Sequence, residues 1–286
     1  MPWIFVLIWS TGFVVARFGM PYVPPLRFLL IRYALTVACF AIWVVAARVA
    51  WPKSKEQWGH LMVTGILMQG GYLGGVWSAV RAGMGAGLVA LLVGLQPVIT
   101  AIWLASRGGI ITRRQWVGLL LGFAGLVLVV WRKLENGGEV NPATMTLAAI
   151  ALLSITVGTL YQKQFVAPCD VRSANLVQQA AAFAVTLPLA LWETGPALWN
   201  AQSIGAMAWS VLALSVGGSS LLYMLIQRGT ATAVTSLLYL VPPCTAVMAW
   251  LLFREPITLL TISGIAMTAL GVWLVVREAR APAAAS

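Results

Sequence analysis

Polar and aromatic side chains that could bind a small organic ligand concentrate in two glycine-rich stretches of the sequence. They are Gln69, Tyr72 and Trp77 in MQGGYLGGVWSAV, and Ser219 and Tyr223 in GGSSLLYMLIQRG. Aromatic side chains supply contact area for such a ligand, while a few amides and hydroxyls orient it by hydrogen bonding. The rest of both stretches is apolar, so the pattern predicts a mostly apolar binding cavity with few polar contacts.

Further candidate ligand-binding side chains lie elsewhere in apolar sequence. They are Trp9, Ser10, Gln96, Tyr161 and Tyr239. Gln96 directly precedes Pro97, and a proline inside a helix removes a backbone donor and clashes with the preceding turn. A polar side chain beside such a break is favoured where a cavity can hydrate it. The same residue types also serve in helix packing, which is the alternative interpretation for each of them.

The residue types needed for catalysis or metal binding are scattered rather than clustered. The three cysteines, Cys39, Cys169 and Cys244, are far apart and share no metal-ligand spacing. The chain has one histidine, His60, near the end of an apolar segment. All seven acidic residues also lie at or near segment ends: Glu56, Glu135, Glu139, Asp170, Glu193, Glu255 and Glu278. We therefore predict neither an enzyme nor a protein with a metal or other cofactor.

The composition is that of an integral membrane protein. Apolar residues make up 60% of the 286 positions, charged residues make up 9%, and the mean hydropathy is +0.90; soluble domains carry about 25% charged residues. A membrane-spanning helix needs about 20 largely apolar residues. Such segments run over residues 2–19, 26–48, 57–79, 85–105, 114–131, 143–164, 173–193, 203–227, 231–252 and 258–277. The predicted class is an all-α membrane protein with ten transmembrane helices.

The sequence repeats itself at an offset of 146 residues without a gap. Pro97 then falls on Pro243, and Trp77 falls on Tyr223. The offset also pairs Gly12 with Gly158, Gly59 with Gly205, Gly71 with Gly217, Gly83 with Gly229, Gly118 with Gly264 and Gly125 with Gly271. We therefore predict two homologous five-helix halves, residues 1–135 and 142–280. Because five is odd, the halves would enter the membrane from opposite sides, as the inverted repeats of many secondary transporters do.

The paired prolines are predicted to interrupt the fourth and ninth helices beside a central cavity. Pro97 and Pro243 would each leave a carbonyl unpaired one turn earlier, at Val93 or Tyr239. In a membrane such a carbonyl must be satisfied by protein or by cavity water. A tolerated kink without ligand contact is the alternative.

Lysine and arginine sit mainly at segment ends, so the net charge of +11 indicates membrane topology rather than nucleic-acid binding. A cytoplasmic N-terminus places eleven of them inside: Arg48, Lys53, Lys55, Arg107, Arg113, Arg114, Lys163, Arg172, Arg228, Arg277 and Arg280. Six then lie outside: Arg17, Arg27, Arg81, Arg132, Lys133 and Arg254. Arg32 lies inside the second segment and is assigned to neither side. This split predicts that both termini are cytoplasmic.

One cation is expected at each mouth of the bundle. The repeat pairs Arg17, near the outer end of the first helix, with Lys163, near the inner end of the sixth. These two side chains would attract a substrate carboxylate or help to close a gate. Snorkelling of both cations to the membrane interface is the alternative.

The two five-helix halves, the early WSTGFVVA, the two proline-bearing helices and the closing FREPITLLTISGIAMTALGVWLV resemble the drug/metabolite transporter superfamily, EamA type. Within that type the chain is most similar to YddG-type bacterial amino-acid exporters. The resemblance implies a ten-helix inner-membrane exporter of amino acids or related metabolites that works by alternating access. One departure is that Glu255 has no acidic counterpart in the first half, which favours a helix-capping role for it.

The function expected from this resemblance is export of small molecules, with aromatic side chains binding the substrate side chain and amides orienting its charged groups. Trp77, Tyr72, Tyr223 and Tyr239 are expected to line one path together with Ser10, Gln69 and Gln96. A lining of this kind also suits nucleosides and drugs, so an exporter of those compounds is an alternative. A channel or a non-transporting membrane scaffold is another. Beyond the substrate, membrane lipid is the expected partner, and nucleic acid is not.

Overall fold

The chain is folded into helices throughout the residues that the computed structural model describes, which are 2–107, 112–135, 138–228, 240–254 and 257–278. The first half forms α1 (Pro2–Gly19), α2 (Pro25–Ala46), α3 (Lys55–Gly65), the π-helical segment η1 (Ile66–Gly71), α4 (Tyr72–Arg81), α5 (Ala86–Val93), α6 (Gln96–Ser106) and α7 (Arg113–Glu135). The second half forms α8 (Pro142–Phe165), α9 (Val171–Trp192), α10 (Ala201–Trp209), the π-helical segment η2 (Ser210–Gly218), α11 (Ser219–Arg228), α13 (Val241–Phe253) and α14 (Leu259–Glu278). The predicted all-helical class is confirmed for these residues.

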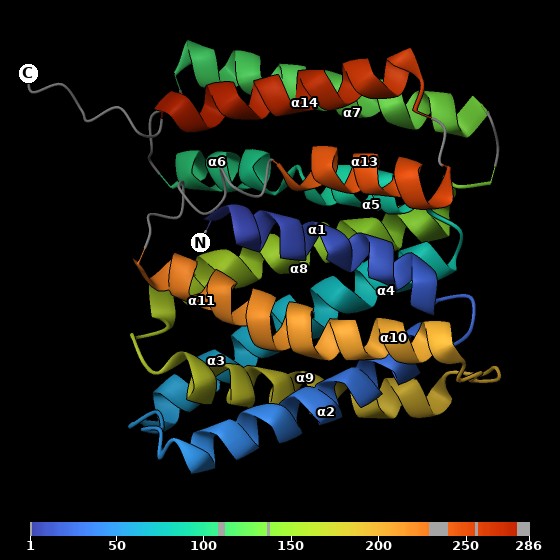
Figure 1. Cartoon of the computed structure of the whole chain (residues 1–286). Coiled ribbons are helices and arrows are strands. Elements are labelled where there is room, and N and C mark those ends of the chain that lie inside the picture. The colour runs from blue at the N-terminus through green and yellow to red at the C-terminus, as the bar shows by residue number, and fades with distance from the viewer. Residues whose placement is uncertain (1, 108–111, 136–137, 229–239, 255–256, 279–286) are drawn as a thin grey trace, which may run out of the picture.

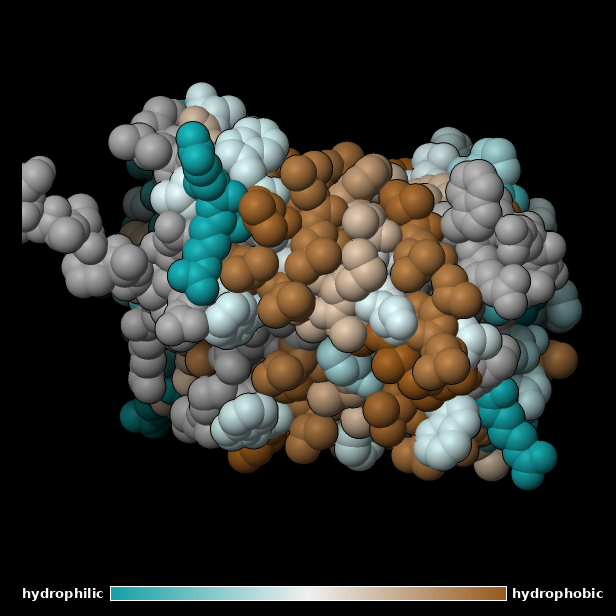
Figure 2. Space-filling view, turned by 90° about the horizontal axis from the view of Figure 1, so that it is seen from above, coloured by the Kyte–Doolittle hydropathy of each residue, from teal (hydrophilic) through white to brown (hydrophobic). Residues whose placement is uncertain are grey.

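The surface of the bundle is apolar across its middle, as a membrane protein requires. Figure 2 shows a band of hydrophobic side chains across one face, with hydrophilic side chains toward its two ends. Five helical stretches of the described residues are long and apolar enough to span a membrane: Pro25–Ala46, Ala86–Trp103, Pro142–Phe165, Val171–Trp192 and Ala201–Gln227. Leu120 and Phe123 of α7 are 65% and 60% exposed. A large exposed apolar surface of this kind is typical of a face that contacts lipid.

The helices are stacked in layers and run roughly along one direction (Figure 1). α7 and α14 form one outer layer, and α2, α3 and α9 lie at the opposite side of the bundle. α1, α4 and α8 lie between these two sides (Figure 1). α1 begins and α14 ends at the same end of the bundle. The side chains that face between these layers are buried, and polar side chains can be accommodated there.

Helix starts at matching places in the two halves are fixed by the same kind of capping. The Ser54 side chain accepts a hydrogen bond from the Gln57 N–H at the start of α3. Asn200, which lies 146 residues later, accepts one from the Ser203 N–H at the start of α10. An N-cap of this type stabilises a helix by about 1 kcal/mol.

The fourth predicted segment is divided in two, because α5 ends at Val93 and α6 begins at Gln96. Pro97 therefore lies in the first turn of α6, where its missing N–H costs no hydrogen bond. Pro243 lies in the first turn of α13, and the residues before Leu240 are outside the described ranges. At the junction of α5 and α6, a Cβ on Gly94 would lie 2.7 Å from Cγ of Pro242. Glycine thus permits the close approach of α13 to this break.

The two π-helical segments lie at matching places in the two halves. In η1 the Tyr72 N–H bonds to the Leu67 carbonyl, and in η2 the Ser219 N–H bonds to the Leu214 carbonyl, each five residues earlier. Both segments contain a Gly-Gly pair. A π-helical turn widens the helix and changes the direction of the side chains that follow. The apolar pattern of both stretches predicts regular helix and gives no sign of this widening.

α7 and α14 cross at glycines that the repeat pairs with one another. A Cβ on Gly125 would lie 2.6 Å from the Gly264 carbonyl oxygen, and a Cβ on Gly271 would overlap the carbonyl oxygen of Gly118. The Thr268 hydroxyl donates to the Gly122 carbonyl oxygen at 3.4 Å. Small residues let helix backbones approach closely inside a membrane.

Replacing Gly271 with alanine is expected to destabilise the protein by about 1–3 kcal/mol, because the added methyl group overlaps backbone atoms of α7. Gly59→Ala is the matched control, since a Cβ there meets nothing within 4 Å. Alanine is the better helix former by about 1 kcal/mol, so the control is expected to be neutral or stabilising. Thermal unfolding in detergent measures both variants. Equal melting temperatures would contradict the close crossing of α7 and α14.

Candidate functional site

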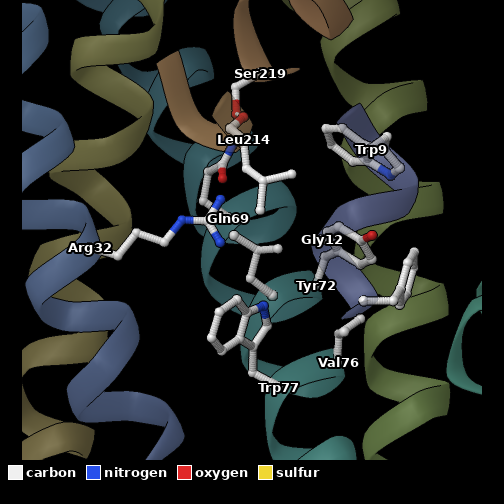
Figure 3. A pocket seen from close by; sticks show the side chains of 11 residues that line it. Trp9, Gly12, Arg32, Gln69, Tyr72, Val76, Trp77, Leu214 and Ser219 are labelled. Carbon is white, nitrogen blue, oxygen red and sulfur yellow. Dashed lines mark hydrogen bonds between the residues drawn. The ribbon is translucent and has the colours of Figure 1, made fainter. Parts of the chain in front are cut away.

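A small pocket lies in the interior of the bundle between helices from both halves. We call it the main pocket, and its lining residues are Trp9, Gly12, Phe13, Arg32, Gln69, Tyr72, Leu73, Val76, Trp77, Leu214 and Ser219 (Figure 3). They come from α1, α2, η1 and α4 of the first half and from η2 and α11 of the second. Its volume is about 30 Å³, enough for about two water molecules.

A second, smaller space adjoins the main pocket at the break between α5 and α6. We call it the side pocket, with a volume of about 10 Å³. It shares Trp9, Phe13 and Tyr72 with the main pocket and adds Gln96 and Pro97. The predicted site residues Trp9, Gln69, Tyr72, Trp77, Gln96 and Ser219 therefore lie around two adjoining spaces.

Two pairs of aromatic rings form much of the apolar wall. Trp9 of α1 and Tyr72 of α4 are parallel, with ring centroids 6.1 Å apart and an interplanar angle of 1°. Trp77 stacks on Phe28 of α2 at a centroid distance of 4.7 Å and is 1% exposed. Aromatic pairs in such geometry are worth about 0.5–1.5 kcal/mol beyond the area that they bury. Rings held in this way present fixed faces to the pocket.

The amide and hydroxyl groups of the two pockets are held by hydrogen bonds to other helices. The Gln69 side-chain amide donates to the Ser219 hydroxyl over 3.4 Å, which is long for a hydrogen bond. The Tyr33 hydroxyl donates to the backbone carbonyl of Gln69 at 2.6 Å and so fixes the π-helical segment η1 against α2. In the side pocket, the Gln96 amide donates to the Thr159 hydroxyl at 3.2 Å. The weakly held Gln69 amide is the group most easily redirected to a ligand.

Arg32 lines the main pocket but is not among the site residues predicted from the sequence. It extends from α2 toward Gln69 and Trp77, and it is 3% exposed (Figure 3). Its Nε donates to the Ser215 hydroxyl of η2 at 2.9 Å, and its guanidinium carbon lies 5.8 Å from the Trp77 ring centroid. The signal in the sequence is a charged residue inside an apolar segment. A count of loop charges gives such a residue no role, so it did not point to Arg32.

Three of the predicted substrate-binding residues, Ser10, Tyr161 and Tyr223, line neither of these two pockets. The Ser10 hydroxyl donates to the Val6 carbonyl in the preceding turn of α1. The Tyr161 hydroxyl lies 2.7 Å from Nδ1 of His60. Tyr223 packs in a separate cluster, and its hydroxyl lies 3.0 Å from the Cys169 sulfur. Tyr239 lies outside the described residues.

The two predicted mouth cations lie away from the main pocket. The Arg17 guanidinium lies 4.8 Å from the Phe253 ring centroid and, with Arg81, borders an open depression at an end of α1. The Lys163 ammonium donates to the Ile226 carbonyl of α11 at 3.1 Å. Arg17 thus contacts the second half of the chain, whereas Lys163 contacts a residue of its own half. Among the described residues, no group of three or more His, Cys, Asp or Glu could hold a metal ion.

Comparison with known proteins shows the family to which this helical bundle belongs. The sequence profile of the EamA-like transporter family matches residues 3–131 and again residues 143–277. This chain belongs to the EamA-like transporter family. The resemblance seen in the sequence is thereby confirmed.

Relatives of this EamA-like transporter are named as transporters in several organisms. The protein named Uncharacterized transporter YvbV of Bacillus subtilis (strain 168) is 25% identical over 98% of this chain and 92% of its own length. The Probable amino-acid metabolite efflux pump of Salmonella typhimurium is 28% identical over 56% of this chain and 51% of its own. The Uncharacterized inner membrane transporter YedA of Escherichia coli (strain K12) is 26% identical over 85% and 78%.

A solved crystal structure also resembles this EamA-like transporter along its whole length. The TM-score is 0.69, and the aligned region covers 98% of this chain and 97% of the other. The sequences are 17% identical, so the comparison establishes a shared fold and nothing further.

Replacing Tyr33 with phenylalanine is expected to destabilise the protein by about 1–3 kcal/mol, because the buried Gln69 carbonyl loses its hydroxyl partner. Tyr22→Phe is the matched control, since the Tyr22 hydroxyl donates to Gln202 at an exposed position. Water replaces that partner, so the control is expected to change stability by less than about 1 kcal/mol. Thermal unfolding in detergent compares them. Equal losses would show that the Tyr33 hydrogen bond does not hold η1 in place.

Proposed function

We propose that this protein exports amino acids or related small metabolites across a bacterial inner membrane by alternating access. The observation that carries the proposal is the main pocket, which is enclosed by helices of both halves and combines aromatic walls with an amide and a hydroxyl. The substrate is held by Trp9, Gln69, Tyr72, Trp77 and Ser219, with Gln96 at the adjoining break. Both termini are cytoplasmic in this proposal, and no cofactor takes part.

Two antiparallel helix contacts support inverted repeats. Gly125 meets Gly264, and the repeat partner of each residue meets the other, since Gly271 meets Gly118. Such reciprocal contacts are characteristic of two-fold symmetry. The pairs run in opposite chain directions, which supports a two-fold axis across the helices and hence in the plane of the membrane. An axis in that plane relates two halves of opposite orientation.

The second contact joins α2 to α9, which the repeat also pairs. At one end of this contact the Arg27 N–H donates to the Glu193 carboxylate at 2.9 Å. At the other end the Ser173 hydroxyl donates to the Ala50 carbonyl at 3.0 Å. The start of α2 therefore lies beside the end of α9, and the start of α9 beside the end of α2. These helices provide a second symmetric seam along which the halves can rock.

The small size of the main pocket fits an occluded state of such a cycle. A volume of about 30 Å³ has no room for a whole amino acid. Substrate entry therefore requires the helices around the pocket to separate toward one side of the membrane. The break between Val93 and Gln96 offers a point where α6 can move relative to α5.

The assignment of amino acids rests on the pocket chemistry and on one relative. The printed name of the Salmonella typhimurium protein describes amino-acid metabolite efflux. Nucleosides and drugs are the alternative substrates, because an aromatic pocket with few polar groups also suits them. A channel and a non-transporting scaffold both differ from a carrier in the kinetics of substrate flux across the membrane.

Counterflow in proteoliposomes tests the proposal. Vesicles loaded with an unlabelled amino acid are expected to accumulate the same labelled amino acid transiently and with saturation, as a carrier requires. The panel includes the twenty amino acids, four nucleosides and a cationic dye. Linear, non-saturating fluxes would indicate a pore, and counterflow of nucleosides alone would assign the alternative substrate.

Trp9→Ala is expected to weaken apparent substrate affinity by about 5- to 50-fold, because it removes one face of the parallel pair at the pocket. Trp116→Ala, on the exposed face of α7, is the matched control and is expected to transport at the wild-type rate. Immunoblotting of membranes checks that both variants reach the same level. Wild-type affinity in Trp9→Ala would show that the main pocket is not the substrate site.

A further inference from the structure

Arg32 places a positive charge in the interior of a membrane-spanning helix. It lies seven residues after the start of α2, roughly 10 Å along the helix. A charged side chain at the centre of a membrane helix costs about 2.5–3.5 kcal/mol on insertion scales. Such a residue is retained where it has a partner or a function.

The protein gives Arg32 only part of the partners that a guanidinium requires. Arginine carries five N–H donors, and the Nε donor is taken by Ser215. Nη1 is buried and has no hydrogen-bond partner in the part of the chain that the structure describes. The neighbouring ring of Trp77 contributes a cation–π contact.

A carboxylate counter-ion is also missing from the surroundings of Arg32 among the described side chains. Glu56, Glu139, Asp170 and Glu193 all lie at or beyond helix ends. Asp170 pairs with Arg172, and the Glu56 carboxylate lies 3.6 Å from Nε2 of His60. The charge of Arg32 therefore faces the main pocket without an acidic partner from those residues.

We propose that Arg32 binds the carboxylate of the transported molecule, so that the substrate class is apolar or aromatic molecules that carry a carboxylate. This inference rests on the proposed function and specifies the chemistry of the same site. A carboxylate accepts two N–H bonds from a guanidinium, and charge-assisted bonds are about twice as strong as neutral ones. Nη1 is the unsatisfied donor that such a ligand would engage.

The shape of the main pocket agrees with a ligand of this class. Figure 3 shows Arg32 and Gln69 on one side of the pocket and Trp9 and Tyr72 on the other. A bound molecule then has its carboxylate at Arg32 and its apolar side chain against the parallel rings. The present volume of about 30 Å³ holds about two water molecules, which is about the space that a carboxylate group needs. The remainder of the molecule requires the pocket to open.

A purely structural role for Arg32 makes a different prediction. Its bond to Ser215 ties α2 to η2, so its loss would lower stability whichever ligand is present. Recognition of a carboxylate instead makes affinity depend on whether the ligand has that group. The preference for an acid over its uncharged amide is therefore the quantity to measure.

The experiment uses the purified full chain in detergent, with isothermal titration calorimetry as the binding assay. The ligands are the twenty amino acids, their amides, 3-phenylpropanoate and phenethylamine. Wild type is expected to bind its preferred acids at least 10-fold more tightly than their amides, from the strength of a hydrogen bond to a charged group. Arg32→Gln is expected to reduce that ratio to within about 2-fold.

Two further variants keep this test decisive. Arg32→Lys retains the charge and is expected to keep a preference for the acid, although weaker because the bidentate geometry is lost. Arg113→Gln, at an exposed position at the start of α7, is the control and is expected to keep the wild-type ratio. If Arg32→Gln fails to fold, the wild-type ratio and the ratio in Arg32→Lys still decide whether Arg32 recognises the carboxylate.

Equal binding of acids and amides by the wild type, or failure of every carboxylate to bind, would overturn the inference. An unchanged ratio in Arg32→Gln would overturn it as well. If carboxylates bind through Arg32 but counterflow is not observed, the proposed function fails while this inference stands. If counterflow of amides equals that of acids, the transport function stands and the inference fails.

Discussion

Polar groups inside a membrane bundle must find partners within the protein or in a cavity, and the middle of this structure is arranged around that constraint. The π-helical segments and the break between α5 and α6 disturb the regular hydrogen bonding of three helical stretches. At η1 the Tyr33 hydroxyl satisfies the Gln69 carbonyl. At the break, the Gln96 amide bonds to Thr159. The main and side pockets lie beside these disturbances, where a polar group can face a cavity instead of lipid.

Glycine determines how closely the two halves approach one another. Gly125 and Gly271 bring α7 and α14 into backbone contact, and Gly94 admits Pro242 to the break after α5. These contacts are between elements far apart in sequence, and lipid offers no hydrophobic driving force to hold them. Close packing across this seam therefore holds the halves together.

Much of the fold could be predicted from the sequence, since apolar segments and the 146-residue offset are local or regular signals. Helix ends in the structure fall within a few residues of the predicted ones, for example Pro142–Phe165 against 143–164. The offset also pairs Gly125 with Gly271 and Gly118 with Gly264, and these four glycines make reciprocal contacts. The opposite orientation of the halves stays a prediction that the reciprocal glycine contacts support.

The candidate site was harder to predict, for two physical reasons. Trp77 and Tyr223 are repeat partners in the sequence. If the two halves are related by a two-fold axis, as the glycine contacts support, two partners meet only when both lie near that axis. Trp77 therefore borders the main pocket, while Tyr223 packs against Leu61 and Cys169. Arg32 could not be predicted as a site residue, because its role depends on contact with η2, about 180 residues away. No local sequence pattern reveals such a contact.

The central claim is that the substrate occupies the main pocket between the halves. A structure determined with bound 4-bromophenylalanine, whose bromine is located by anomalous scattering, tests it most directly. The account predicts bromine density beside the parallel rings of Trp9 and Tyr72, with the carboxylate at the Arg32 guanidinium. Density on the lipid-facing surface, or beside Tyr161 or Tyr223 instead, would contradict it.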